Sequence, residues 1–100
     1  MSLFQLTGFQ RDLMYVIASL DRPSGQGVKE RLEEELGVET NHGRLYPNLD
    51  VLVDEGFVER GDLDRRTNYY ALSEAGREAL IERREWEDQF LEHAEELDSE

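Results

Sequence analysis

Two side chains near the middle of the chain have the types and the spacing that base recognition in DNA requires. Arg44 and Asn48 are four residues apart, which places them one turn apart if the segment is helical. Arginine forms paired hydrogen bonds with guanine, and asparagine does so with adenine, in the major groove of B-DNA. The alternative is that both are ordinary surface residues. We expect base contacts, on condition that a helix presents the pair.

The residues around this pair could bind the phosphate backbone. Asn41 and His42 lie where such a helix would begin, and the exposed N–H groups of a helix start attract phosphate. His42 could contact a phosphate or a base, or it could equally be only a capping residue. Tyr46 could offer its hydroxyl to a phosphate, or it could serve in core packing alone.

A second polar group contains two adjacent arginines within a run of four residues: Arg65, Arg66, Thr67 and Asn68. Such side chains suit contacts with phosphates or with the minor groove. The alternative is a solvated turn in which the arginines offset Asp62 and Asp64. Gln26 and Lys29 are weaker candidates for phosphate contacts near the start of an earlier helix.

The net charge argues against nucleic acid as a partner. The chain has 24 acidic and 11 basic residues, which gives a net charge of −13, whereas DNA-binding domains are usually basic. All the basic residues are arginines except Lys29. An excess of carboxylates with almost no lysine resembles the composition of proteins from high-salt cytoplasms, where dense carboxylates keep the surface soluble.

After Asp21, three long stretches of this acidic chain nevertheless lack carboxylates altogether. They are Arg22–Lys29, Thr40–Leu49 and Arg65–Ser73, and the acidic residues crowd into the segments between and after them. A charge pattern that served solubility alone would have no reason to spare these stretches. They form one surface if the fold brings them together.

Length and composition indicate a single small domain in the cytoplasm. One hundred residues make one domain, and oligomerisation often completes a core of this size. The absence of cysteine excludes disulfides and thiolate metal sites. No apolar run approaches the ~20 residues of a membrane span, and Met1–Leu6 do not resemble a signal peptide.

Apolar spacing predicts two helices before the candidate base-reading segment. Thr7 is the expected N-cap of the first, in which apolar residues recur at helical spacing as far as Leu20. Ser24 is the expected N-cap of the second helix, and Gly37 is its stop signal. A short connection, Val38–Asn41, leads to the next element.

The candidate base-reading residues lie in a predicted third helix, from roughly His42 to Glu55. Leu45, Leu49 and Leu52 form its buried stripe. Pro47 is awkward in this helix because it lacks an N–H and crowds the carbonyl four residues earlier. We expect either that the helix starts near Leu45 or that its first turn is irregular.

A β-hairpin and a long helix complete the predicted order. Phe57–Gly61 and Arg66–Leu72 are predicted antiparallel strands joined by a turn. Ser73 is the expected N-cap of a last helix that extends to about Leu97.

This last helix carries a predicted dimer seam with a 7-4-7 spacing: Ala79, Trp86, Phe90 and Leu97. Arg83 and His93 interrupt the seam. Large aromatic residues exposed on a lone terminal helix would be an apolar liability, so we expect a partner helix to cover them. The alternative is a monomer in which the helix folds back.

Three helices, a hairpin and a long helix match a winged helix-turn-helix, a mainly α fold with a small β-hairpin wing. In this fold the third helix enters the major groove, and the wing lies by the backbone or the minor groove. We assign residues 1–72 to the DNA-binding domain and residues 73–100 to a C-terminal dimerisation helix with an acidic tail.

Specific residues also carry a family resemblance. Gly43–Leu52, with its Leu-Tyr-Pro motif, and the following Glu55–Glu59 resemble the recognition-helix signature of the PadR family. Matches to the family's wing and last helix are Arg66, Tyr69, Tyr70, Leu72, Ser73 and Gly76. The chain is similar to the short PadR-like regulators of halophilic archaea. The resemblance covers roughly Thr7 to Trp86. It implies a homodimeric repressor or activator of transcription that binds double-stranded DNA, and it leaves any small-molecule effector open.

No constellation of residues predicts catalysis, a metal site or a cofactor. The two histidines fall in different predicted elements, and no serine has the surroundings of a nucleophile. We therefore do not expect an enzyme. The competing hypothesis is an acidic protein-interaction module, such as a DNA mimic or antirepressor, that binds another regulator.

Overall fold

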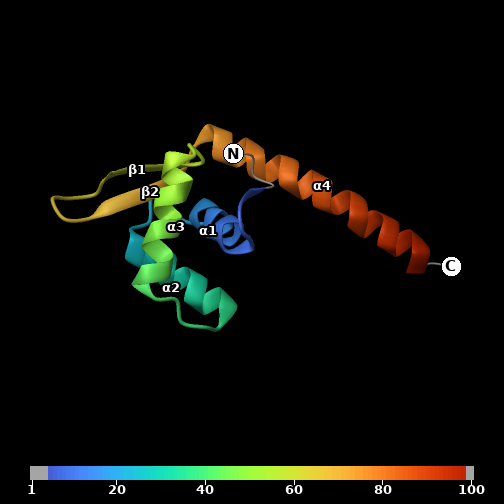
Figure 1. Cartoon of the computed structure of the whole chain (residues 1–100), viewed down its shortest axis with the longest axis horizontal. Coiled ribbons are helices and arrows are strands. Elements are labelled where there is room, and N and C mark those ends of the chain that lie inside the picture. Colours follow the sequence, from blue (N-terminus) through green and yellow to red (C-terminus); the bar gives the residue numbers. More distant parts are fainter. Residues whose placement is uncertain (1–4, 99–100) are drawn as a thin grey trace.

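Helices and a single hairpin follow one another in the predicted order in the computed structural model, which describes residues 5–98 (Figure 1). The helices are α1 (Gly8–Ala18), α2 (Gly25–Leu36), α3 (His42–Asp54) and α4 (Glu74–Asp98). The strands β1 (Val58–Asp62) and β2 (Asn68–Leu72) pair antiparallel. This arrangement confirms the mainly α fold with a small hairpin. Most of the segment examined for a signal peptide, and the last two residues of the acidic tail, lie outside the described residues.

Capping side chains fix the helix ends where the sequence predicted them. Thr7 and Gln10 form a reciprocal capping box at the start of α1. Ser24 and Ser73 accept backbone N–H groups at the starts of α2 and α4. Gly37 ends α2 in the left-handed region with φ of 69°, where a glycine carries no steric penalty.

Helix α3 begins at His42, so the alternative of a start near Leu45 is wrong. The carbonyl of Asn41 accepts hydrogen bonds from the N–H groups of both Arg44 and Leu45. The first turn therefore combines a tight i→i+3 bond with the regular α-helical bond. Pro47 follows in the second turn without ending the helix.

The hairpin differs from its prediction at the loop end. Strand β2 begins at Asn68, two residues later than predicted. The reason is local: the carboxylate of Asp64 accepts the N–H groups of Arg66 and Thr67, each at 2.9 Å. These residues thus form a turn closed by a side chain instead of extending the strand.

A short third segment, which sequence analysis missed, pairs with the hairpin. Ser24 forms an isolated antiparallel bridge with Tyr69, and the N–H of Tyr70 donates to the carbonyl of Pro23 at 2.8 Å. The residues just before α2 are thereby fixed to β2. The start of α2 and the wing consequently hold a fixed position relative to each other.

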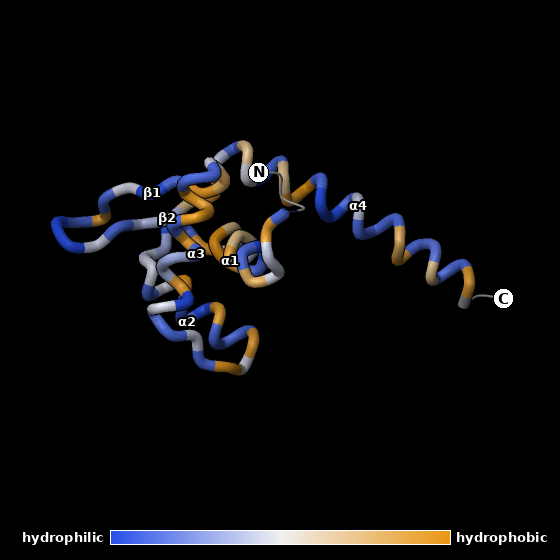
Figure 2. Tube along the Cα trace, viewed as in Figure 1, coloured by the Kyte–Doolittle hydropathy of each residue, from blue (hydrophilic) through white to orange (hydrophobic). Residues whose placement is uncertain are grey.

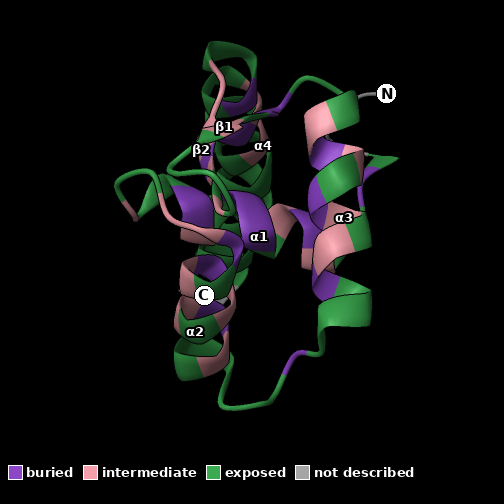
Figure 3. Cartoon of the chain, turned by 90° about the vertical axis from the view of Figure 1, so that its left-hand side faces the viewer, coloured by how far each residue is buried: buried purple, intermediate pink, exposed green. Residues whose placement is uncertain are grey.

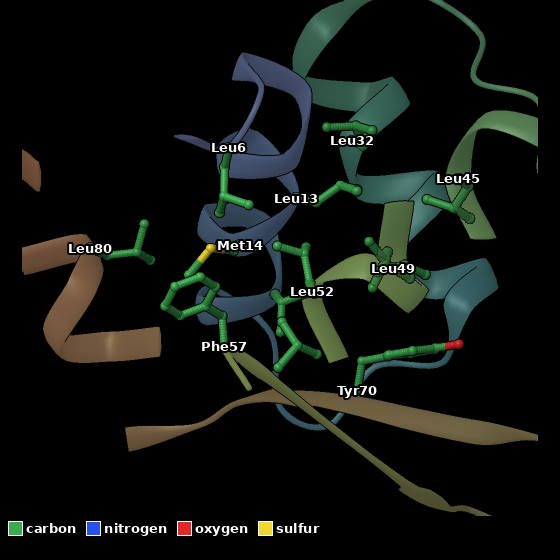
Figure 4. Close-up of a cluster of buried hydrophobic side chains, with 13 residues drawn as sticks. Leu6, Leu13, Met14, Leu32, Leu45, Leu49, Leu52, Phe57, Tyr70 and Leu80 are labelled. Carbon is green, nitrogen blue, oxygen red and sulfur yellow. The ribbon is translucent and has the colours of Figure 1, made fainter. Parts of the chain in front are cut away.

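The core lies between the three short helices, the base of the hairpin and the first turns of α4 (Figure 4). Its buried members are Leu6, Leu13, Met14, Ile17, Val28, Leu32, Leu45, Leu49, Leu52, Phe57, Val58, Tyr70 and Leu80. The predicted stripe of α3 is completely buried in this cluster. Leu80 comes from α4, so the first part of that helix is packed with the DNA-binding unit that sequence analysis ended at residue 72.

Close packing of the α4 start against the link between α3 and β1 depends on Gly76. A Cβ at this position would overlap the carbonyl oxygen of Phe57. Beyond these first turns α4 leaves the domain and extends to one side (Figure 1), which gives the molecule dimensions of 59 × 29 × 22 Å.

Candidate nucleic-acid interface

A hollow of about 400 Å³ lies where the start of α2, the middle of α3 and the hairpin meet. Its lining residues are Ser24, Gly25, Gln26, Tyr46, Arg66, Thr67, Asn68 and Tyr70. Each of them belongs to one of the three stretches that lack carboxylates. The structure therefore brings the three stretches together, as the sequence predicted, and five of the predicted site residues meet in this hollow.

Tyr46 reaches the start of α2 because Gly25 lies beneath it. A Cβ on Gly25 would stand 2.6 Å from the hydroxyl oxygen of Tyr46 and 2.7 Å from a ring carbon. Tyr46 is half-buried and packs against the core, while its side chain also lines the hollow. The arrangement places a phenol hydroxyl beside the free N–H groups of a helix start, and both can donate to an anion.

Stacked side chains support the base of the wing. The guanidinium carbon of Arg22 lies 4.7 Å from the centroid of the Tyr69 ring, a cation–π geometry. Tyr69 also covers Gly61 on the paired strand, where a Cβ would overlap the ring. The stack therefore joins the segment before α2 to both strands of the hairpin.

The tip of the wing presents its arginines to solvent. Arg65 and Arg66 are exposed, whereas the Asp64 carboxylate closes the turn by binding backbone N–H groups. The hydrogen bond from the N–H of Arg66, with a further one from Thr67, holds the pKa of Asp64 below its usual value. The ionised carboxylate of Asp64 is thus already hydrogen-bonded within the loop.

Lys29, a predicted phosphate ligand, is engaged inside the chain. Its ammonium nitrogen lies 3.1 Å from a carboxylate oxygen of Glu33. The same carboxylate accepts the N–H of Thr40 at 2.7 Å, so it ties the link before α3 to α2. This backbone bond, followed by Lys29, lowers the pKa of Glu33. Lys29 therefore stabilises the connection between α2 and α3 through Glu33.

Asn41, not His42, caps α3. The Oδ1 atom of Asn41 accepts the N–H of Arg44 at 2.8 Å, so the alternative in which His42 caps the helix is wrong. His42 is exposed, and its ring centroid lies 5.6 Å from that of Tyr46. Lys29, Asn41 and His42 share a second hollow of about 470 Å³, which also contains Glu33 and Glu39.

Arg44 stands exposed at the start of α3, supported by α1. Its guanidinium carbon lies 3.8 Å from the centroid of the Phe9 ring. Stacking on an aromatic face leaves the edge of the guanidinium, with its N–H donors, available to a partner. This contact with Phe9 was not predicted, because helical spacing does not report which helix lies opposite.

Asn48 has a different environment from Arg44. Its Oδ1 accepts from Nε2 of Gln10 at 2.9 Å, and its Nδ2 donates to the carbonyl of Arg44 at 2.7 Å. A pairing with adenine uses both of these side-chain atoms, so the two internal bonds restrict the orientation of the amide and compete with that pairing. In this structure the side chain of Asn48 fastens α3 to α1.

Exposed residues recur along the outward side of α3 (Figure 3), and their charge changes along its length. Gly43 and Pro47 are exposed on the first half, and Asp50 and Asp54 are exposed on the second. Only the first half is therefore free of carboxylates.

Asp50 has a cationic partner on the hairpin. Nη1 of Arg60 lies 3.0 Å from Oδ1 of Asp50. Arg60 is paired across the strands with Tyr70. Burial raises the pKa of the Tyr70 hydroxyl, and a hydrogen bond with Arg60 acts in the opposite direction.

The predicted dimer seam is exposed along most of its length. The exposed fractions are 39% for Trp86, 59% for Phe90 and 60% for Leu97. The Trp86 and Phe90 rings meet edge to face at 4.8 Å, and apolar positions recur along α4 in Figure 2. Ala79 differs, because it packs against the core of its own chain.

Within residues 5–98, no helix combines the length and the apolar character needed to cross a bilayer. The same part of the chain contains no group of three or more histidine and acidic side chains arranged to hold a metal ion.

Comparisons with known proteins identify the family and the fold of the chain. A family model described as "Transcriptional regulator PadR-like family" matches residues 13–82. The complex hsRosR-S1 matches with a TM-score of 0.82 and 40% sequence identity over 96% of this chain and 88% of that chain. RosR of H. salinarum, crystallised from NaBr, matches with a TM-score of 0.79 and 41% identity over 95% of this chain and 89% of that one.

A more distant neighbour shows the fold alone. PadR of Bacillus subtilis in complex with operator DNA matches with a TM-score of 0.67 and 23% identity, over 76% of this chain and 46% of that chain. No curated protein sequence matches the chain. The family model covers most of the chain and the RosR structures cover nearly all of it, so this protein is a member of the PadR-like family of transcriptional regulators, with a winged-helix fold.

Proposed function

We propose that the protein is a sequence-specific DNA-binding transcription regulator that acts as a homodimer in a high-salt cytoplasm. The observation that carries the proposal is the hollow between α2, α3 and the wing. In a chain with a net charge of −13, its lining contains no carboxylate. Phosphates meet less like-charge repulsion at such a surface than elsewhere on the chain, and the neighbouring arginines attract them.

The proposal gives each part of the surface a role. The first half of α3 enters the major groove, where Arg44 reads a base edge from its support on Phe9. Tyr46 and the start of α2 hold a phosphate beside the hollow. The wing follows the backbone or the minor groove with Arg65, Arg66, Thr67 and Asn68. Among the remaining candidates, Gln26 lines the hollow, and Asn41 and His42 line the second hollow beside it. Lys29 and Asn48 position the elements of this surface.

Dimerisation completes the proposed DNA-binding unit. A second copy of α4 would cover the exposed seam of Trp86, Phe90 and Leu97. A two-fold dimer presents two α3 helices to half-sites that are one helical turn of DNA apart, or a multiple of that spacing.

We also expect an unusual salt dependence. DNA binding normally weakens steeply with salt, because cations leave the phosphates. Here Asp50, Asp54, Glu30 and Asp62 border the carboxylate-free surface, so cations must also enter between these acids and the phosphates. The predicted fall of affinity with salt is therefore weak or reversed. A steep ordinary decrease would contradict this adaptation. The support for high salt is the composition and the likeness to RosR of H. salinarum.

The proposal is tested by fluorescence anisotropy of labelled random-sequence duplexes, from low to molar KCl. We expect binding by the wild type, weaker binding by Arg66→Gln, and wild-type binding by Arg31→Gln. Arg31 is the control, because its side chain is 43% exposed but lies outside the carboxylate-free stretches. No bound fraction at any salt concentration would overturn the proposal and favour the acidic interaction module instead.

A further inference from the structure

The ion pair between α3 and the wing is placed beside the proposed DNA surface, yet neither residue is among the candidates read from the sequence. Arg60 comes from β1 and Asp50 from the middle of α3, and their charged atoms are 3.0 Å apart. Residues paired across antiparallel strands project from the same face of the sheet. Arg60 therefore projects from the face that carries Tyr70, which lines the hollow.

The pair is exposed enough to exchange partners. The exposed fractions are 42% for the Arg60 side chain and 56% for that of Asp50. An ion pair in contact with water is held by a small net free energy, because water competes for both charges. Opening it therefore costs little when another anion is offered to Arg60.

The other anion would have the same chemistry as the present one. A guanidinium binds carboxylate oxygens and phosphate oxygens through the same fork of N–H donors. Asp50 thus holds Arg60 in the way that a DNA phosphate would hold it. Asp50 also lies just beyond the carboxylate-free half of α3, one turn after Tyr46, at the border that the DNA backbone must cross.

We propose that Arg60 is a further phosphate-binding residue and that Asp50 occupies it in the free protein, to be exchanged for a DNA phosphate on binding. This inference rests on the proposed function, and it adds that Asp50 competes with DNA phosphates for Arg60. Asp50 then weakens DNA binding by keeping Arg60 engaged, and its direct repulsion of phosphates is the smaller effect.

A double-mutant cycle separates these two effects. Binding of a random-sequence duplex pool is measured by anisotropy for the wild type, Asp50→Asn, Arg60→Gln and the double variant. Exchange predicts that Asp50→Asn tightens binding by about fivefold when Arg60 is present, a change typical of coupled charges in contact. With Gln at position 60, the same substitution changes affinity by less than about twofold, because no cation is released.

The sign of the coupling decides the outcome. If Asp50 acts only by repelling phosphates, its removal helps as much or more when Arg60 is absent, because the charge of Asp50 is then not neutralised. If Asp50→Asn increases affinity as much or more in the Arg60→Gln background, the exchange of partners at Arg60 is overturned. DNA binding by the wild type would then still support the proposed function. Absence of wild-type binding overturns both.

A matched control is available on α2. Arg31 and Glu35 form a pair with the same separation, 3.0 Å, and similar exposed fractions of 43% and 54%. Glu35→Gln makes the same change in net charge without freeing a cation beside the hollow, so we expect unchanged affinity. An equal gain from Glu35→Gln would show that total charge, not the release of Arg60, explains the effect of Asp50→Asn. Thermal unfolding of every variant verifies that the fold is retained.

Discussion

Two glycines illustrate how single residues shape this protein. A side chain at position 25 would meet the flexible end of Tyr46, whereas one at position 76 would meet the backbone of Phe57. A tyrosine ring can rotate away, but a backbone carbonyl in a tight turn cannot move without shifting its strand. Substitutions at the two glycines should therefore affect different properties.

Gly25→Ala should impair DNA binding while leaving stability close to that of the wild type. The added methyl group displaces the hydroxyl of Tyr46 from the start of α2, where we place a phosphate. Affinity for duplex DNA and the thermal midpoint are measured on the same sample. Loss of stability without any loss of affinity would mean that Tyr46 serves in core packing alone.

Gly76→Ala should instead lower stability by about 1–3 kcal/mol, the usual cost of forcing extra atoms into a packed site. The overlap is with the carbonyl oxygen of Phe57, beside the join between α3 and β1. Denaturant unfolding measures the change, with Gly8→Ala as the control because a Cβ there meets no atom within 4 Å. Equal stability of the two variants would contradict the close approach.

Arg44→Ala should relax base preference at one position of the binding site, by roughly 1–3 kcal/mol. The residue stands exposed on Phe9 and has no acidic partner among the ion pairs of the described chain. Selection of sites from random DNA by the variant and the wild type measures the preference. Unchanged selectivity would remove Arg44 from the reading role.

Sequence predicted residue types better than residue partners. Thr7, Ser24 and Gly37 were predicted because capping depends on neighbours in the chain, and neighbours are visible in the sequence. The contacts of Asn48 with Gln10 and of Arg60 with Asp50 depend on how separate elements pack. Spacing alone places Asn48 beside Arg44, but it does not show that Gln10 of α1 donates a hydrogen bond to the Asn48 amide.

At the scale of elements, two connections are closed by carboxylates that bind backbone N–H groups. Asp64 closes the wing turn, and Glu33 fastens the link between α2 and α3. These hydrogen bonds favour the charged carboxylates, so the pKa of each acid is lowered. The elements that face the proposed DNA surface are therefore positioned by ionised acids outside the core.

Acid should loosen these two connections. Because each pKa is lower in the folded protein, the stabilising contribution is complete above the ordinary value and is lost as pH falls through the lowered one. The ordinary values are 3.8 for Asp64 and 4.5 for Glu33. Amide ¹H–¹⁵N shifts of Thr67 and Thr40 should titrate with midpoints below those values. Midpoints at or above them would contradict the hydrogen bonds as the cause.

The order of elements was predictable, and their tertiary pairing was less so. Helix periodicity and caps gave all four helices, because each signal spans only a few residues. The bridge between Ser24 and Tyr69 was missed, since a single paired residue has no periodicity to detect. The loop end of the wing was misplaced because Asp64 binds backbone groups that the predicted strand would have used.

At the scale of the whole molecule, charge is arranged by region. The three stretches without carboxylates meet at one hollow, and α4 carries an exposed apolar seam away from it. We therefore propose that one end of the molecule binds DNA and that the other binds a second copy of the chain.

Phe90→Ala should weaken the dimer, because it removes an aromatic group that is 59% exposed in the single chain and lies on the seam. Ile81→Ala is the control. Ile81 is 49% exposed on the same helix but lies about 140° around it from Trp86, at 100° per residue. Sedimentation equilibrium in molar KCl measures both variants against the wild type. A monomeric wild type, or equal weakening by the two variants, would contradict the seam.

An NMR titration of the ¹⁵N-labelled protein with duplex DNA tests the central claim most directly, namely that an acidic protein binds DNA through one carboxylate-free surface. The account predicts that shifted amides concentrate at the start of α2, in the first half of α3 and in the loop between β1 and β2. Shifts centred on the acidic second half of α4, or no shifts at all with saturating DNA in molar KCl, would contradict it.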